Sequence, residues 1–160
     1  MKLVDLLALQ PHPEGGHYRE TVRLADGVDG RSKMTAILFH LAQGERSHWH
    51  RVDADELWLW QAGSPLTLRI EGQDVITLGG DVAGGQQLQA LVPAGKWQSA
   101  DSTTGWTLVS CVVAPGFDFA GFELAPADFS IEHVESPGSK PAAVADGVRP
   151  IDRSLLWLGV

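Results

Sequence analysis

The chain has 160 residues, 44% of them hydrophobic, and its 20 acidic and 12 basic residues give a formal net charge of -8. A chain of this length buries roughly two-thirds of its unfolded surface around one core, so we expect a single domain. The negative charge disfavours phosphate backbones and anionic lipids, and no apolar run approaches the roughly 18 residues that cross a membrane. The composition therefore predicts neither a nucleic-acid nor a membrane partner.

The cysteine content and the start of the chain both favour a cytoplasmic protein. The single cysteine, Cys111, cannot form an internal disulfide. The apolar start is short and interrupted by Asp5, which does not suit a signal peptide.

The first predicted element is a short helix at residues 2–9, where apolar residues recur at helical spacing before Pro11. The periodicity then changes to short apolar or alternating segments rich in β-branched and aromatic residues, separated by glycine-rich turn clusters. These segments predict strands at residues 35–42, 56–62, 66–72, 87–93 and 106–115. Because no helix separates consecutive strands, the fold class is all-β, an antiparallel sandwich or barrel.

The pattern weakens toward the C-terminus. Residues 116–125 predict a last strand, and residues 126–135 predict a short helix. We assign residues 126–160 to a C-terminal extension, with a flexible linker near residues 136–147 on the basis of its composition.

The main candidate site is the stretch SHWHRVDADELWLWQAG. Side chains two apart on a regular strand share a face, so we expect His48 and His50 to point the same way. A turn after these histidines would bring Glu56 on the next strand to the same place. Two imidazoles and a carboxylate are suitable ligands for a divalent transition metal, which makes this a candidate metal site.

The same residues also suit a metal-free pocket. A neutral His50 could act as a general base, with Glu56 or Asp55 fixing its tautomer. Trp58 or Trp60 could stack on a sugar or another planar ring. Ordinary core packing is the alternative interpretation of both tryptophans.

A second candidate region is the stretch PHPEGGHYRET. Its paired glycines permit a sharp turn, beside which polar side chains gather. We expect Glu14, Tyr18 or Arg19 to line the pocket. The alternative is that this stretch only ends a helix and begins a strand.

These stretches resemble a known family. The first motif of the cupin superfamily resembles a set of residues in this chain: Gly44, His48, His50, Glu56 and Gly63. VPAGKWQSA resembles the second motif, which usually reads Pro-x-Gly-x-x-His. More narrowly, four stretches are similar to the cupin-5 family, also called DUF985, and together they cover most of residues 1–125: PHPEGG, HRVDADELW, VPAGKWQSA and SCVVAPGFDFAGFEL.

The resemblance implies a double-stranded β-helix over residues 1–125, that is, a small jelly-roll barrel, commonly paired into homodimers and with a pocket at one mouth. Carried over position by position, the cupin metal ligands map to His48, His50, Glu56 and Gln98, where Gln98 stands at a position that is normally histidine. An amide oxygen is a weaker ligand than imidazole. Two alternatives therefore remain for this pocket: that it binds Fe, Mn, Ni or Zn, or that it binds no metal.

The leading functional hypothesis is a pocket for a small polar molecule, such as a sugar or nucleotide sugar, with isomerase- or epimerase-like chemistry. His50 and Glu56 are its candidate catalytic residues, and a divalent metal is an optional cofactor. The alternative is a binding module that holds a small metabolite without metal and without turnover. The sequence leaves open whether the protein is an enzyme, because cupins host many unrelated chemistries.

Overall fold

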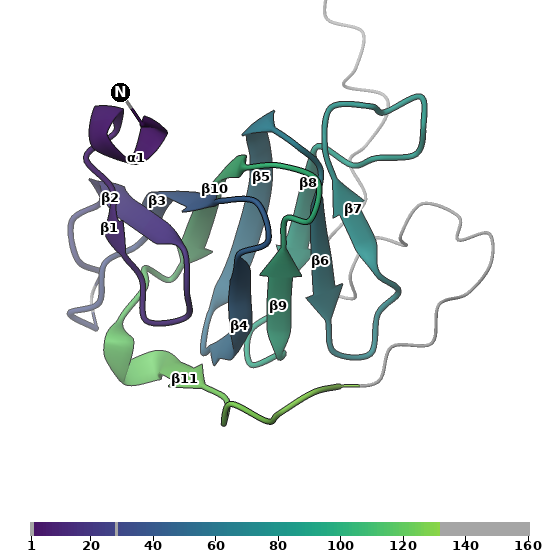
Figure 1. Ribbon diagram of the computed structural model, residues 1–160. Helices are drawn as coiled ribbons and strands as arrows, with labels where there is room; N and C mark the ends of the chain where they lie inside the picture. The colour runs from purple at the N-terminus through teal and green to yellow at the C-terminus, as the bar shows by residue number, and fades with distance from the viewer. Residues whose placement is uncertain (1, 28, 132–160) are drawn as a thin grey trace, which may run out of the picture.

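The computed structural model of the chain describes residues 2–27 and 29–131 (Figure 1). Almost all of its regular structure is β. In chain order the elements are α1 (Leu3–Leu6), β1 (Gln10–Pro11), β2 (His17–Arg23), β3 (Thr35–Leu41), β4 (Arg46–Val52), β5 (Asp55–Gly63), β6 (Leu66–Ile70), β7 (Ile76–Leu78), β8 (Gln89–Val92), β9 (Gln98–Asp101), β10 (Thr107–Ala114), the 3-10 turn η1 (Phe119–Gly121) and β11 (Phe122–Leu124).

The strands form two antiparallel sheets that enclose one core. One sheet has six strands in the order β1-β2-β3-β10-β5-β8, and the other has five in the order β11-β4-β9-β6-β7. The main cluster of buried side chains draws on both sheets, for example Phe39, Trp58, Leu68 and Val109. The predicted all-β class is therefore confirmed. No helix in the described part of the chain is long and apolar enough to cross a membrane.

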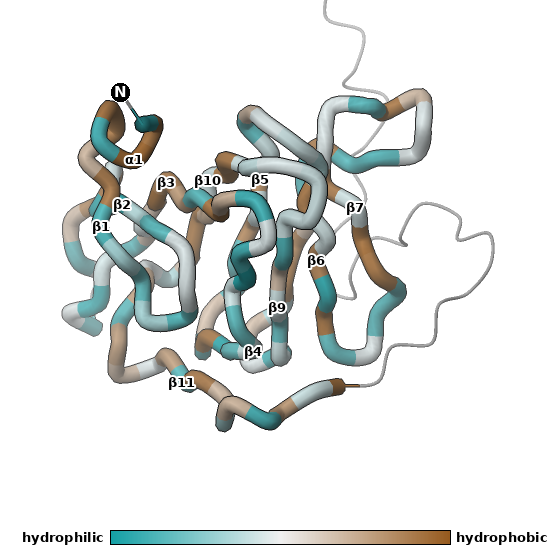
Figure 2. The backbone as a smooth tube through the Cα atoms, viewed as in Figure 1, coloured by the Kyte–Doolittle hydropathy of each residue, from teal (hydrophilic) through white to brown (hydrophobic). Residues whose placement is uncertain are grey.

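Alternation along the strands explains why the sequence forms these sheets. In β6, Leu66, Leu68 and Ile70 are buried while the residues between them are partly exposed. The same alternation runs along β10. Figure 2 shows the resulting mixture of hydrophobic and hydrophilic residues along the chain. Such alternation places one face of each strand in the core, which is the pattern that predicted the strands.

Several elements differ from the sequence-based expectation. The N-terminal helix is only four residues long. The sequence analysis did not predict β1, β7 and β9, and it gave a strand at β2 only as an alternative interpretation. Residues 126–131 contain a turn rather than the beginning of the predicted helix. The remainder of that helix and the predicted linker at residues 136–147 lie outside the described residues.

A β-bulge interrupts β4. Ser47 pairs with Ala100 and His50 pairs with Gln98, so three steps along β4 match two steps along β9. The extra residue reverses the alternation, and both Ser47 and His50 face inward. The expectation that His48 and His50 share a face is therefore wrong, because it assumed a regular strand.

The turn at Gly15 and Gly16 brings the chain tightly against the barrel. Both glycines have positive φ angles, 107° and 69°. A Cβ atom on Gly16 would lie 2.7 Å from the His40 carbonyl oxygen and 2.7 Å from Leu41 Cδ2, and a Cβ atom on Gly15 would overlap the Arg46 carbonyl oxygen. Only glycine satisfies both the backbone angle and this close approach.

Gly16→Ala is therefore expected to lower the unfolding free energy by about 2–4 kcal/mol, from left-handed strain plus steric overlap. Gly72→Ala is the matched control, because Gly72 has a similar φ of 75° but nothing within 4 Å of its Cβ position. It should cost only about 1 kcal/mol. Denaturant unfolding of both variants measures the difference, and equal costs would contradict the close approach.

Candidate functional site

A cavity of about 420 Å³ opens into the barrel beside β2, β3 and the η1–β11 segment. Its polar lining includes His12, Glu14, His50 and Glu56. Its apolar lining includes the aromatic side chains of Tyr18, Phe39, Phe117, Phe119 and Phe122. Two carboxyl groups and two imidazoles therefore share one space that is walled largely by aromatic rings.

Glu14 lies at the centre of the polar group. Its Oε1 accepts a hydrogen bond of 2.8 Å from the Ser47 hydroxyl. Its Oε2 lies 3.4 Å from His50 Nε2 and 3.3 Å from His12 Nδ1. Burial raises the pKa of Glu14 to about 7, although the nearby His12 and the Ser47 hydrogen bond act in the opposite direction. The carboxyl group can therefore gain or lose its proton near neutral pH.

The backbone fixes the orientation and tautomer of His50. Its Nδ1 lies 2.8 Å from the His48 carbonyl oxygen, which can only accept a hydrogen bond, so Nδ1 carries the proton. In the neutral ring, Nε2 is then the basic atom, and it faces Glu14. Burial lowers the pKa of His50 and favours this neutral form, while Glu56 opposes the shift. His50 and Glu14 thus form a pair that can share one proton.

A directional chain of hydrogen bonds holds Glu56. The Trp58 indole N–H donates to Gln98 Oε1 at 2.9 Å, which fixes the orientation of the amide because an indole can only donate. Gln98 Nε2 then donates to Glu56 Oε2 at 2.5 Å. Burial raises the pKa of Glu56, against the influence of His50. Burial is thus the effect that favours the protonated form of Glu56, while the Gln98 hydrogen bond acts against it and holds one carboxyl oxygen in place.

Aromatic rings surround His12. The Tyr18 ring meets it edge-on, with centroids 4.6 Å apart, and Phe119 stacks over it at 6.4 Å. The Glu14 backbone N–H donates to His12 Nδ1. Burial is the main cause that lowers the pKa of His12, so its neutral form is favoured. Phe119 is itself 54% exposed, which places an apolar ring at the rim of the cavity.

The predicted site residues separate into two groups. Four of the residues expected in the pocket do line the cavity: Glu14, Tyr18, His50 and Glu56. The others lie elsewhere. His48 Nε2 makes a hydrogen bond of 3.0 Å with the Pro126 carbonyl oxygen, and Arg19 is exposed on β2.

Neither tryptophan lies at the cavity. Trp58 is 1% exposed and belongs to the core, where its indole binds Gln98. Trp60 packs against the same core and donates to the Ser64 carbonyl oxygen. Both follow the alternative interpretation of ordinary core packing, because the inward face of β5 passes from the cavity at Glu56 into the closed core.

The predicted metal ligands are not gathered around one point. The ring of His48 is directed to Pro126, and the amide oxygen of Gln98 accepts from Trp58. His50 and Glu56 alone remain at the cavity, so the four-ligand set does not fit there. Within residues 2–27 and 29–131, one group of three histidine and glutamate side chains has metal-site spacing, and it consists of His17, His40 and Glu45. Binding of Fe, Mn, Ni or Zn stays a prediction.

Some cavity residues were not among the predicted site residues. His12 contacts Glu14, and Phe122 lies 5.7 Å from His50 between ring centroids. Ser47, which is fully buried and does not line the cavity, donates to Glu14 from behind. The glycine turn after His12 was the available signal, since it implied a polar residue held in a tight loop. Nothing in the sequence indicated Ser47, because its inward direction depends on the β4 bulge.

Replacing Glu14 should change how stability depends on pH. A carboxyl pKa that folding raises from 4.5 to about 7 gives stability that is fully present below about pH 4.5 and lost as pH rises through 7. Glu14→Gln removes this loss. As the pH rises from about 5 to about 8, the unfolding free energy of the variant should therefore increase relative to that of the wild type, on the order of 3 kcal/mol.

Thermal or denaturant unfolding at both pH values measures this change. Glu123→Gln is the control, because Glu123 is an exposed partner of Arg51 and should give nearly the same difference at both pH values. If the unfolding free energies of Glu14→Gln and the wild type changed with pH in parallel, the raised pKa of the buried Glu14 carboxyl group would be contradicted.

Comparison with known proteins identifies relatives in sequence and structure. A family described as "Cupin superfamily (DUF985)" matches residues 1–125. A crystal structure of a Shewanella oneidensis protein is 41% identical, covering 76% of this chain and 81% of the other, with a TM-score of 0.72. A hypothetical protein from Leishmania major is 36% identical, covering 75% of this chain and 83% of the other, with a TM-score of 0.68. A search of curated proteins found no match.

A more distant structure bears on the fold alone. A Klebsiella pneumoniae protein with a double-stranded β-helix domain is 19% identical, covers 79% of this chain and 96% of its own, and has a TM-score of 0.55. Together with the two antiparallel sheets, this likeness confirms the predicted double-stranded β-helix.

Proposed function

The chain belongs to the Cupin_5 (DUF985) family of the cupin superfamily, and from this premise we propose that its cavity binds a small polar molecule and moves a proton on it. Sugars and nucleotide sugars are the proposed substrate class, and isomerase- or epimerase-like chemistry is the proposed reaction. The observation that carries the proposal is the pairing of Glu14 with His50 Nε2 at 3.4 Å inside the cavity.

The first step uses this pair as the base. An ionised Glu14 beside a neutral His50 can accept one proton from a carbon next to a substrate carbonyl group. A general base works best when its pKa is close to the operating pH, and the Glu14 pKa of about 7 meets that condition. The backbone carbonyl oxygen of His48 keeps a proton on Nδ1 of His50. His50 can therefore hold the transferred proton only at Nε2, facing Glu14.

The second step uses Glu56 as the acid. Loss of the proton places negative charge on the carbonyl oxygen, and a neutral carboxyl group can donate a hydrogen bond to that oxygen. Gln98 donates to Oε2 of Glu56, so the proton of the neutral carboxyl group would be carried by Oε1 and donated from there. Return of the proton by the same pair to the neighbouring carbon gives an isomer. Return to the first carbon after the planar intermediate has turned its other face toward the pair gives an epimer. Both outcomes conserve atoms and electrons.

The lining supports a polar but uncharged reacting group. Glu14 lines the cavity, and its ionised form, which the first step uses, would repel an anionic group there. Arg23 lies at the rim, where it forms an ion pair of 2.8 Å with Glu20. A phosphate or carboxylate on a distant part of the substrate would meet Arg23, while Phe119 covers an apolar ring face.

The competing function is a binding module without turnover. The aromatic walls and the cavity volume support ligand binding whether or not a proton moves. Two experiments separate the alternatives. A thermal-shift panel of sugars and nucleotide sugars first identifies a ligand, because a ligand that binds only the folded state raises Tm.

The second experiment incubates that ligand with the protein in deuterium oxide and follows carbon-bound hydrogen by proton NMR. Exchange at a carbon next to a carbonyl is expected with the wild type. Glu14→Gln and His50→Gln should each slow it by about 10²–10⁴-fold.

His48→Gln is the matched control, because this neighbouring histidine is directed to Pro126 outside the cavity. It should keep the wild-type exchange rate. Ligand binding without exchange would favour the binding module, and equal loss in all three variants would contradict the assignment of Glu14 and His50.

A cytoplasmic location and a homodimer stay predictions.

A further inference from the structure

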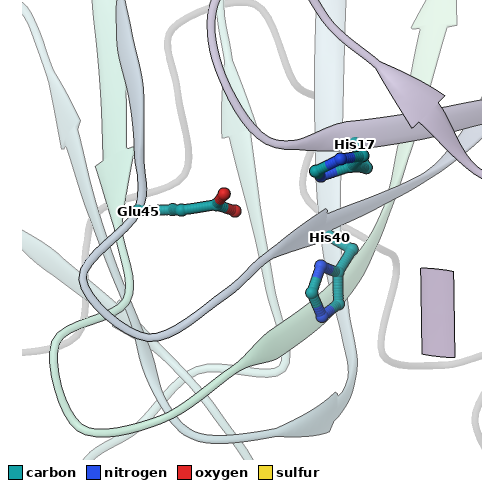
Figure 3. A group of neighbouring side chains, drawn as sticks. All are labelled: His17, His40 and Glu45. Atoms are coloured by element: carbon teal, nitrogen blue, oxygen red, sulfur yellow. The ribbon is translucent and has the colours of Figure 1, made fainter. Parts of the chain in front are cut away.

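Three metal-ligating side chains meet away from the cavity. His17 at the start of β2 pairs directly with His40 near the end of β3, and Glu45 lies in the turn that follows β3. Figure 3 shows the Glu45 carboxylate directed toward the two imidazole rings. One ligand atom from each residue lies within 4.8 Å of the others.

This cluster lies on the outer face of its sheet. Phe39 and Leu41, the neighbours of His40 in β3, are buried in the core. Tyr18, the neighbour of His17, lines the cavity. Adjacent residues on a strand point to opposite faces, so the two histidines face away from both the core and the cavity.

The two imidazoles have unsatisfied nitrogens. His40 is only 6% exposed. Nδ1 of His17 and Nδ1 of His40 are both buried without a hydrogen-bond partner, and they are the only such side-chain nitrogens among the described residues. Buried polar atoms are almost always paired, so two orphaned nitrogens in one cluster point to a ligand that would fill their lone pairs.

Neighbouring groups hold the cluster in position. Glu45 Oε2 accepts a hydrogen bond of 2.8 Å from the Ala42 backbone N–H, which orients the carboxylate and leaves Oε1 for a ligand. The Trp106 ring stacks on His40, with centroids 6.1 Å apart and planes at 23°. Preorganised donors of this kind lose little freedom when an ion binds.

We propose that His17, His40 and Glu45 form a binding site for one divalent transition-metal ion, with Zn²⁺ as its representative. Two imidazoles and one carboxylate are a known three-ligand set for Zn²⁺, and water would complete the coordination. His17 and Glu45 are only partly buried, which leaves a route for the ion.

The position of the site suggests what the ion would do. His17 directly follows the Gly15–Gly16 turn, and Glu45 precedes Arg46, whose carbonyl oxygen lies against Gly15. A bound ion would therefore join the start of β2, the end of β3 and the start of β4. We infer a structural ion that braces the turn carrying Glu14, at a distinct site from the cavity.

The test is calorimetric titration of the untagged full chain with Zn²⁺ after treatment with a chelator. The wild type should bind one equivalent, and Zn²⁺ should raise its Tm. His17→Gln and Glu45→Gln should each weaken Zn²⁺ binding by more than about tenfold and lose the Tm increase. Glu45→Gln keeps a side-chain oxygen for the Ala42 N–H, so the fold should survive, and circular dichroism of the metal-free variants checks this.

His48→Gln and His50→Gln are the controls, since they remove one imidazole outside the cavity and one inside it. Both should keep one equivalent of Zn²⁺ at wild-type affinity. Absence of Zn²⁺ binding by the wild type would overturn the proposal. So would binding that survives in His17→Gln and Glu45→Gln but is lost in His50→Gln, because that result would place the ion in the cavity.

Discussion

One backbone hydrogen bond organises the candidate site. The His48 N–H, at the β4 bulge, donates to the Glu14 carbonyl oxygen at 2.7 Å and so fastens the glycine turn to the barrel wall. The same bulge directs Ser47 and His50 inward, where both meet the Glu14 carboxyl group. Loss of this contact would separate the carboxyl group from both partners, so the arrangement of these three side chains depends on a main-chain interaction.

The electrostatics follow from this placement. The ion-pair partners of Glu14 within the described residues are both histidines, and burial disfavours the charged form of all three groups. The pKa of the acid rises while those of the bases fall, so the neutral pair and the charged pair approach each other in energy. The proposed proton transfer relies on this balance. The packed aromatic rings and strands around this group of side chains offset the cost of burying it.

The sequence predicted the barrel well because alternation reports which face of a strand is buried. It predicted β3, β5 and β10 for that reason, and it missed β9, whose buried residues Gln98 and Ser99 are polar. For the site, the types and spacing of the residues indicated His50 and Glu56. Alternation along β5 could not separate the cavity from the core on the same face, so Trp58 was expected at the pocket. The bulge that turns His48 outward depends on a contact with Glu14, 34 residues earlier in the chain, which no local pattern encodes.

The most direct test of the shared proton is nitrogen-15 NMR of His50 across the neutral pH range, with His50→Gln used for assignment. The account predicts a neutral ring protonated on Nδ1 at neutral pH, together with a change at Nε2 as Glu14 titrates near pH 7. Glu14→Gln should abolish that change. A neutral ring protonated on Nε2 would contradict the account. So would a ring that titrates like an exposed histidine, with nitrogen signals that do not change when Glu14 titrates.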